Sequence, residues 1–249
     1  MSKLINLVLS EQVFKFGLKV NVVAIVNDND EFMLVDSGFV GSYDSLIEQL
    51  DNNKLLINNL KGIIVTHQDH DHIANLAYLK KLNPSIEIYS SKIEKPYLDG
   101  SKENLRIKPL YNRIDYTDPL KKIGIDEQIS MISSIPTVEV DKVVEDNQVI
   151  DFANGLTIIL TPGHMPGHLC VLVNELKTLI AGDMFTVEKK QLLLARRDFS
   201  LNYEDVIKST KKLLNYNFDK IIAYHGGEYN QDVKQTIKEL LKKEAKNNL

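Results

Sequence analysis

The sequence predicts a single domain of the α/β class over residues 1–249, and three observations support this prediction. The chain has 249 residues, of which 43% are hydrophobic, enough for one domain with a sizeable core. Short strand-like apolar runs alternate with stretches of helical periodicity. A continuous apolar run at 62–66, followed by a helical stretch and another strand, is typical of parallel strands with helices outside the sheet.

Turn and stop signals divide the first part of the chain. Residues 27–30 (Asn-Asp-Asn-Asp) form a strong turn signal between two apolar runs and predict a hairpin. Asn83-Pro84 ends a helical stretch. The predicted elements are strands at 18–26 and 32–36, a helix at 42–53, a strand at 62–66, a helix at 73–82 and a strand at 86–90.

The middle and the last part of the chain differ in character. Residues 93–141 hold four of the seven prolines and show no long period, so we interpret them as an insertion that serves as a substrate lid. Beyond them, Asn154-Gly155 predicts a tight hairpin turn. The predicted elements there are strands at 148–152, 156–161, 169–173 and 178–181, a helix at 203–214, a strand at 220–224 and a helix at 231–245.

The charge, the cysteine content and the N-terminal apolar run argue against several classes of protein. The formal net charge is −4 with both signs mixed, which argues against a nucleic-acid surface. The single cysteine, Cys170, cannot form an internal disulfide and is expected to be a buried strand residue. The apolar run at 4–9 is too short for a membrane span and lacks a cleavage site. We therefore expect a cytoplasmic protein with a small-molecule substrate and neither nucleic-acid nor membrane partners.

The six histidines all lie in three short segments that directly follow predicted strands. These segments are 67–72, 164–168 and His225, and a fourth strand ends at Asp183. Because α/β sheets place ligands in loops at strand ends, we expect these side chains to meet. Imidazole and carboxylate together suit zinc, iron, manganese or cobalt. The alternation of donors within 67–72 allows one segment to serve two ions about 3.5 Å apart.

These segments resemble the motifs of the metallo-β-lactamase superfamily. The first family motif, H-x-H-x-D-H, reads HQDHDH at 67–72. TPGHMPGH at 161–168 is similar to the third motif of glyoxalase II and lactonase-type members. AGD at 181–183 and YHG at 224–226 match the fourth and fifth motifs, and DSG at 36–38 looks like an early turn of the family. The resemblance covers nearly the whole chain and implies an αββα sandwich of metallo-β-lactamase type, with metals at its edge.

The resemblance also implies a dinuclear centre and its ligands. Asp69 stands where the family has its second histidine, and a shifted register does not restore the motif because it would need Asp and His at Ala74 and Asn75. The implied ligands are His67, Asp69 and His164 for the first metal, Asp71, His72 and His225 for the second, and Asp183 as the bridge between them.

Asp69 changes the expected charge of that centre. Three ligand carboxylates, two divalent ions and a bridging hydroxide sum to about 0, where the usual motif gives about +1. Such a centre is a weaker Lewis acid and leans toward manganese or iron. Zinc tolerates carboxylate ligands and stays the favoured metal. Of the other motif residues, we expect His70 to lie outside the centre, and His168 and Asp36 to brace the loops or the ligands.

The function that the resemblance implies is hydrolysis by a metal-bridging hydroxide, with Asp71 as the catalytic residue that orients it. The motif at 161–168 favours a small ester, thioester or lactone as substrate. One alternative is a phosphodiesterase. Another is a di-iron redox protein related to flavodiiron oxygen or nitric oxide reductases, in which a carboxylate replaces the second histidine. The missing flavin-binding half disfavours the redox alternative, and the complete ligand set disfavours a non-catalytic binding role.

Overall fold

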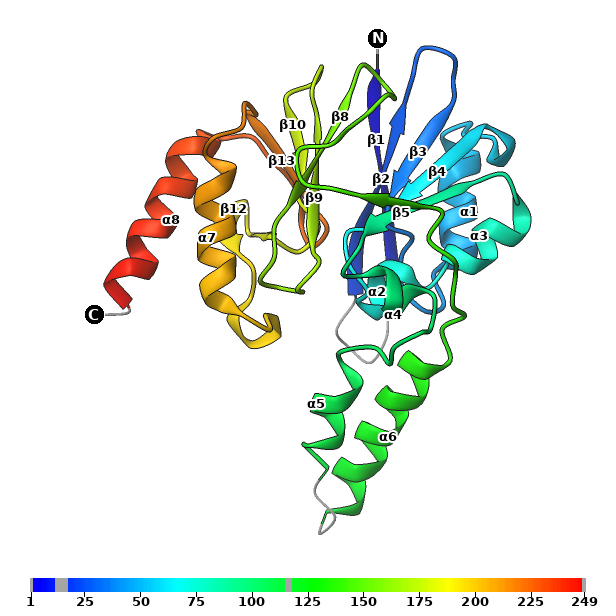
Figure 1. The fold of residues 1–249 in the computed structure, drawn as a ribbon, viewed down its shortest axis with the longest axis vertical. Coiled ribbons are helices and arrows are strands. Elements are labelled where there is room, and N and C mark those ends of the chain that lie inside the picture. The colour runs from blue at the N-terminus through cyan, green and yellow to red at the C-terminus, as the bar shows by residue number, and fades with distance from the viewer. Residues whose placement is uncertain (1, 12–17, 115–117, 248–249) are drawn as a thin grey trace.

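Two six-stranded sheets packed face to face, with helices on both outer faces, form the body of the protein (Figure 1). The structure is a computed structural model and describes residues 2–11, 18–114 and 118–247. Helices α1 and α3 cover one sheet, and α7 and α8 cover the other. This αββα arrangement confirms the predicted fold class.

The first sheet contains the predicted hairpin and the predicted parallel strands. The neighbours β1–β2 and β2–β3 are antiparallel, whereas β3–β4, β4–β5 and β5–β6 are parallel. In spatial order its strands are β1 (Lys3–Glu11), β2 (Leu18–Val26), β3 (Phe32–Val35), β4 (Leu60–Ile64), β5 (Glu87–Ser91) and β6 (Lys142–Val144). Its connections hold α1 (Tyr43–Asn52), a 3₁₀ turn (Ile57–Asn59), α2 (His70–Ile73) and α3 (Leu76–Leu82).

The helix predicted at 73–82 is wrong in one respect, because the structure has two short helices over 70–82. Asn75 lies at the break between α2 and α3. Its side-chain amide donates to the Ser37 carbonyl oxygen at 2.7 Å and to Ser42 Oγ at 2.9 Å. These bonds to the loop after β3 fix the break and hold α2 against the end of the sheet.

The second sheet confirms the hairpin predicted at Asn154-Gly155. Both residues have positive φ (61° and 102°), and β7 and β8 pair antiparallel on either side of them. In spatial order the strands are β14 (Gly227–Tyr229), β13 (Lys220–Ala223), β10 (Thr178–Ile180), β9 (Leu169–Val173), β8 (Leu156–Leu160) and β7 (Val149–Ile150). The remaining elements of this half are β11 (Phe185–Glu188), β12 (Gln191–Leu194), a 3₁₀ turn (Arg197–Phe199), α7 (Tyr203–Leu213) and α8 (Val233–Asn247).

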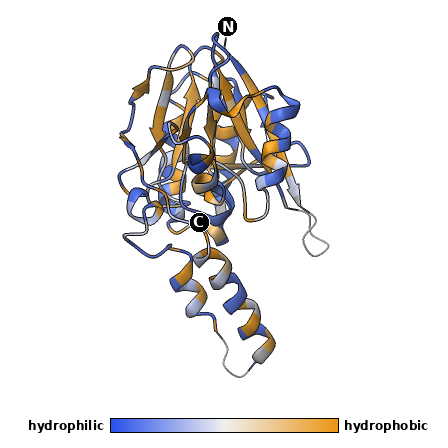
Figure 2. Ribbon diagram, turned by 90° about the vertical axis from the view of Figure 1, so that its right-hand side faces the viewer, coloured by the Kyte–Doolittle hydropathy of each residue, from blue (hydrophilic) through white to orange (hydrophobic). Residues whose placement is uncertain are grey.

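Apolar side chains fill three layers. Val35 and Ile64 of the first sheet meet Ile158 and Val171 of the second between the sheets, and Cys170 is buried on the other face of β9. Figure 2 shows the apolar strands inside the body. Burial of each such aliphatic side chain stabilises the folded state by about 1.5–3 kcal/mol relative to leaving it exposed. This rigid core fixes the strand ends from which the candidate site is built.

Residues 93–141 contain helices that the sequence analysis did not predict. These are α4 (Lys95–Leu98), α5 (Ile107–Tyr111) and α6 (Pro119–Ser133). We call residues 105–114 and 118–135 the helical arm, because α5 and α6 extend side by side from the sandwich (Figure 1). Their apolar residues pack mainly on one another, as a small cluster of Ile107, Leu110, Ile129 and Ile132. The expectation of a segment without regular elements was therefore wrong, whereas its role as a lid stays a prediction.

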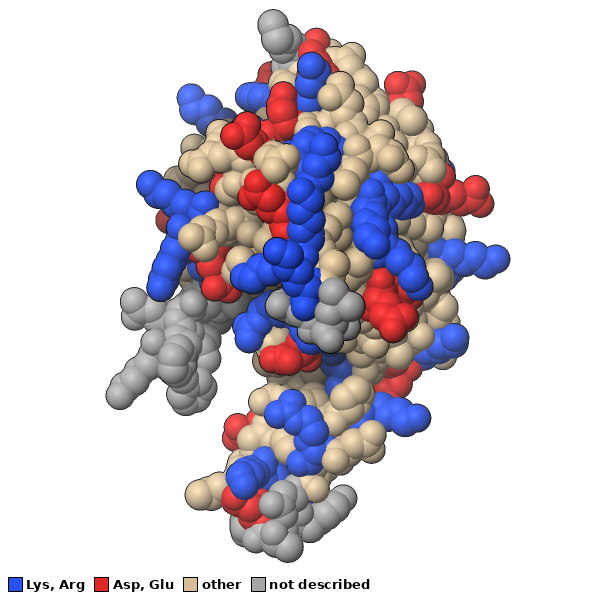
Figure 3. All heavy atoms as spheres, turned by 90° about the vertical axis from the view of Figure 1, so that its left-hand side faces the viewer, with Lys and Arg blue, Asp and Glu red and all other residues tan. Residues whose placement is uncertain are grey.

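The outer surface of the second sheet's helices is polar and mixed in charge. Figure 3 shows Lys and Arg side chains interspersed with Asp and Glu over the face that α7 and α8 form. Among the described helices, we find none with the length and apolar character that a membrane span requires.

Candidate metal centre

The candidate centre lies where four strands end. Residues 67–72 follow β4, residues 161–168 follow β8, Asp183 follows β10 and His225 follows β13. Strand β4 belongs to the first sheet and the other three strands belong to the second. The centre therefore draws its side chains from both sheets, at the kind of edge where α/β sheets bind ligands.

A change of backbone conformation within residues 67–72 directs the side chains to two positions. Asp69 has extended backbone (φ −61°, ψ 140°) and caps the short helix α2, which begins at His70. The His72 N–H donates to the Asp69 carbonyl oxygen at 2.9 Å. His67 and Asp69 thus precede the helical turn, whereas Asp71 and His72 lie within it. One loop can therefore supply donors to two neighbouring ions.

The structure brings His67, Asp69 and His164 together, and we call them the first half-site. Asp69 Oδ2 lies 3.3 Å from His67 Nε2 and 3.0 Å from His164 Nε2. All three side chains are buried. These are the three residues that the resemblance to the family implies as ligands of the first metal.

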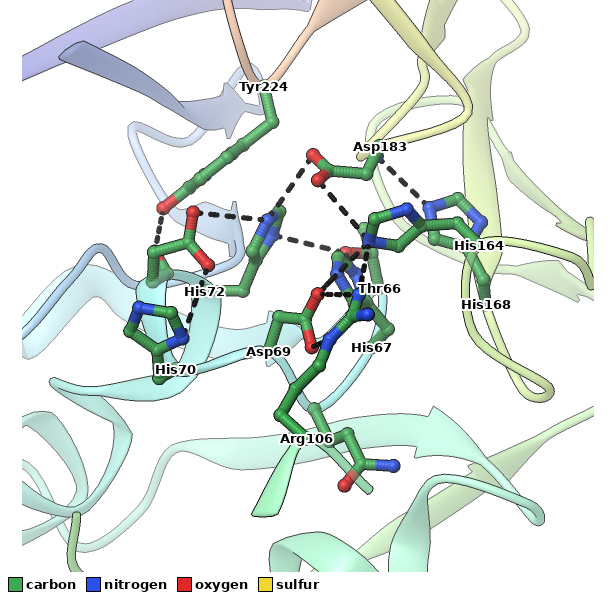
Figure 4. A network of polar contacts seen from close by, with 12 residues as sticks. Thr66, His67, Asp69, His70, His72, Arg106, His164, His168, Asp183 and Tyr224 are labelled. Atoms are coloured by element: carbon green, nitrogen blue, oxygen red, sulfur yellow. Dashed lines mark hydrogen bonds and ion pairs between the residues drawn. The ribbon is translucent and has the colours of Figure 1, made fainter. Parts of the chain in front are cut away.

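Asp71, His72 and His225 also come together, and we call them the second half-site. Asp71 Oδ2 lies 3.3 Å from His225 Nε2 and 4.0 Å from His72 Nε2. Asp183 lies between the half-sites, with Oδ1 3.3 Å from His72 Nε2 and Oδ2 3.4 Å from His164 Nε2 (Figure 4). The predicted bridge thus contacts both groups.

Several atoms of the centre fit a metal ion. Within the described part of the chain, the buried atoms His67 Nε2, His72 Nε2 and Asp183 Oδ1 make no hydrogen bond of good geometry. Buried polar atoms are rarely left without partners in folded proteins. Each half-site offers donor atoms within 4.8 Å of one another, of the imidazole and carboxylate types that zinc, manganese and iron accept. The residues present therefore fit two divalent ions, and their role as ligands stays a prediction.

Two buried residues orient the histidines of the first loop. Asp36 Oδ2 lies 2.8 Å from His72 Nδ1, and Asp36 also accepts from the Thr66 N–H and hydroxyl. Thr66 Oγ1 lies 2.9 Å from His67 Nδ1. Both Nδ1 atoms are thereby engaged, which leaves the Nε2 atoms for the centre. Asp36 thus lies where a bracing residue would.

The two remaining histidines differ in position. His168 Nε2 accepts from the Asp183 N–H at 3.1 Å, and its Nδ1 lies 2.8 Å from Thr161 Oγ1. It therefore joins the loop at 161–168 to the bridging residue. His70 is partly exposed and belongs to none of the donor groups of the described residues.

The charges of the second half-site favour cation binding. Burial lowers the pKa of His72, but Asp36, Asp183 and Asp71 outweigh burial and raise it well above its ordinary value. Burial likewise lowers the pKa of His225, and the carboxylates of Asp183 and Asp71 raise it to about 10. A metal ion must displace these protons, so its apparent affinity falls as the pH is lowered.

Glu94 joins the two loops that carry most of the donors, and the sequence analysis missed it. Its side chain is buried and accepts the N–H of Gln68 at 2.9 Å and the N–H of Gly167 at 2.8 Å. Burial raises the pKa of Glu94 to about 7, although both N–H groups lower it. Glu94 belongs to no motif, so only the folded structure reveals it.

Replacing Glu94 with glutamine should remove a pH dependence of stability from the metal-free protein. The folded-state pKa is raised above the ordinary value of 4.5, so the folded protein keeps a proton that the unfolded chain has released. The stabilisation is fully present below about pH 4.5 and is lost as the pH rises through 7, a loss of roughly 3 kcal/mol. Urea denaturation of chelator-treated protein from about pH 5 to pH 8 measures it. A constant stability difference between wild type and E94Q over this range would contradict the expectation.

Arg106 is the other residue that the sequence analysis missed. It precedes α5 at the root of the helical arm. Its Nε donates to Asp69 Oδ1 at 2.7 Å, and its Nη2 donates to Asp69 Oδ2 at 2.5 Å. The same Nη2 lies 3.1 Å from His164 Nε2 (Figure 4). The guanidinium group thus contacts two members of the first half-site.

Known proteins resemble this chain in sequence and in fold. A family model described as the metallo-beta-lactamase superfamily matches residues 16–225. The probable metallo-hydrolase YybB of Bacillus subtilis (strain 168) is 26% identical over 235 residues, which cover 90% of this chain and 93% of that protein. Hydroxyacylglutathione hydrolase GloC of Haemophilus influenzae is 26% identical over 211 residues, 84% and 86% of the two chains. A metallo-beta-lactamase family protein from Thermus thermophilus has a TM-score of 0.69 at 19% identity, covering 97% of this chain and 79% of that one.

These matches confirm the predicted superfamily and its fold, and the names of the relatives agree with the predicted metal-dependent hydrolase. The family model spans most of the chain, from before β2 to the last of the predicted ligands. The chain therefore belongs to the metallo-beta-lactamase superfamily.

Proposed function

We propose that this protein is a dinuclear metal-dependent hydrolase of small esters, thioesters or lactones. The observation that carries the proposal is the grouping of donors into two half-sites with Asp183 between them. Membership of the superfamily supports the metal dependence. Zinc is the proposed metal, and Asp69 keeps manganese and iron as the alternatives to test.

In the proposed mechanism the protein holds the reacting groups in place. When bound, two metal ions would supply a water of lowered pKa and polarise the oxygen of the substrate. The residues of each half-site would hold one ion, and Asp183 would contact both. Asp71 would orient the attacking water and pass a proton from it to the departing alcohol or thiol. No side-chain nucleophile is required, because the water itself would supply the oxygen that replaces the alcohol or thiol on the carbonyl carbon.

The contacts of Asp71 hold its side chain in place, as the proposed role of orienting the attacking water requires. One oxygen of its carboxylate faces His225 Nε2 at 3.3 Å. The Tyr224 hydroxyl donates to its backbone carbonyl oxygen, and the Tyr224 ring stacks on the His72 ring with centroids 3.7 Å apart. Asp71 is thus fixed from two sides at the second half-site.

A cavity at the root of the helical arm is the proposed place for the non-reacting part of a small substrate, because residues next to His72 and Arg106 in the chain line it. It has a volume of about 200 Å³ and lies between the helical arm and the body. Its lining includes Ile73, the residue after His72, and both Asn104 and Ile107 on either side of Arg106. A volume of this size suits a small acyl or alcohol group. The similarity to GloC, which is named a hydroxyacylglutathione hydrolase, supports the inclusion of thioesters.

A panel of an ester, a thioester, a lactone and a phosphodiester tests the proposal. The protein is stripped with chelator and reloaded with zinc, manganese or iron(II). The loaded protein should hydrolyse one of the three carbonyl substrates at least about 100-fold faster than the stripped protein. Turnover of the phosphodiester alone would favour a phosphodiesterase. A visible band of oxo-bridged iron with consumption of oxygen or nitric oxide would favour the redox alternative.

A further inference from the structure

The two half-sites differ in what already neutralises their charge. Asp69 of the first half-site forms a two-bond salt bridge with Arg106, through Nε and Nη2. Within the described residues, no lysine or arginine forms a salt bridge with Asp71 or Asp183. The first half-site therefore holds a guanidinium, which stays charged at neutral pH, whereas the second half-site is paired with no lysine or arginine of the described residues.

The atom that Arg106 contacts is the atom that a metal ion would need. Asp69 Oδ2 faces both histidines of the first half-site, at 3.3 Å from His67 Nε2 and 3.0 Å from His164 Nε2. Nη2 of Arg106 contacts this same oxygen and also lies 3.1 Å from His164 Nε2. A carboxylate already paired with a guanidinium attracts a further cation less strongly, and the two positive charges repel each other. Metal and guanidinium thus compete for one donor set.

The root of the helical arm places Arg106 at this position. The residues on its N-terminal side bind the neighbour of Asp69, because Asn104 Nδ2 donates to the Gln68 carbonyl oxygen at 2.9 Å and the Leu105 N–H donates to Gln68 Oε1 at 3.0 Å. The Arg106 side chain is itself 18% exposed. The backbone is therefore anchored beside the centre, while the side chain has a path to solvent.

We propose that Arg106 takes the cation position of the first half-site in the metal-free protein and must be displaced before an ion binds there. The second half-site consequently fills first, and the protein passes through a form that holds a single ion. This inference rests on the dinuclear centre of the proposed function, but it concerns the binding of metal and is independent of the substrate.

Zinc titration in the presence of a competing chelator tests the inference on the full chain. Wild type should bind two ions with dissociation constants at least about tenfold apart. Arg106→Gln should tighten the weaker constant by about tenfold or more and leave the tighter constant within about twofold. Arg113→Gln is the matched control, since Arg113 is an exposed arginine of the same arm, and it should behave like wild type. Asp69→Asn should abolish the weaker ion and so identify its site.

Two results would overturn the inference. The first is equal pairs of constants in wild type and R106Q, and the second is weaker binding of the first-site ion in R106Q, which would make Arg106 a support of the metal. Circular dichroism of each variant verifies that it is folded. If the protein binds two ions but turns over no substrate of the panel, the proposed hydrolase function is rejected. The displacement of Arg106 is then decided by the titration alone.

Discussion

Replacing Asp183 with alanine is expected to abolish hydrolysis and to release metal from both half-sites. Asp183 faces His72 with one oxygen and His164 with the other, so its loss removes a donor from each group. The loss of a ligand should exceed the 10–100-fold effect typical of residues behind the ligands, so kcat/KM should fall by more than about 100-fold. Metal content after gel filtration and the rate with the best substrate of the panel are the two measurements.

His70→Ala provides the matched control for this experiment. His70 lies in the same loop as the ligands, is partly exposed and belongs to neither half-site. The variant should keep its metal content and its rate within about twofold. A D183A protein that retains two ions, or an H70A protein that loses them, would show that the ligand assignment is wrong.

Replacing Gly226 with alanine should strongly destabilise the folded protein. Gly226 follows His225 with a φ of 100°, which an L side chain rarely adopts, and an added Cβ would lie 1.9 Å from the Val187 carbonyl oxygen. That oxygen belongs to β11, whose Val187 N–H donates to the His225 carbonyl oxygen at 2.9 Å. The strand must move and carry His225 with it. We expect a loss of about 2–5 kcal/mol in the free energy of unfolding, together with weaker metal binding.

Gly124→Ala tests whether this effect depends on position. Gly124 lies in α6, and an added Cβ there meets no atom within 4 Å. Alanine should stabilise this helix by up to about 1 kcal/mol. Urea denaturation of both variants gives the comparison. A G226A protein as stable as wild type would mean that β11 does not lie against His225 in solution.

The strands of the two main sheets followed from the sequence where a strong local signal marks them. Continuous apolar runs indicated β4 and β9, and Asn154-Gly155 indicated the turn between β7 and β8. The small sheet of β11 and β12 escaped prediction because Lys189 and Lys190 form its turn with positive φ (49° and 65°). Lysine is not a turn signal, so only the pairing of the strands defines this hairpin.

Helix α6 was missed although its beginning carries a signal. Asp118 caps the helix through a bond from the Lys121 N–H, and Pro119 stands at the first helical position. The apolar residues of α6 pack mainly with those of the short helix α5, so they lack the regular stripe that packing on a large core imposes. The helical spacing of its apolar residues was therefore too irregular to predict the helix from the sequence.

The donor residues were open to prediction because each directly follows a strand, where the backbone is fixed by the sheet. The residues that support the donors from outside the motifs were not. Glu94 and Arg106 reach the centre from segments without a motif, and their contacts with Gly167 and Asp69 bridge 73 and 37 residues of sequence. Contacts between residues so far apart in sequence form only in the folded chain. The spacing of neighbouring residues in a motif therefore does not predict them.

The division of the donors between the two sheets has a consequence for the life of the protein in a cell. The loop after β4 carries one set of the predicted ligands and the loops of the second sheet carry the other, so bound metal would link the two sheets at the edge of the sandwich. Ions that bind only the folded chain stabilise it by mass action. The supply of metal would then set the lifetime of the protein as well as its activity. Metal-free protein unfolds more often and is therefore degraded sooner.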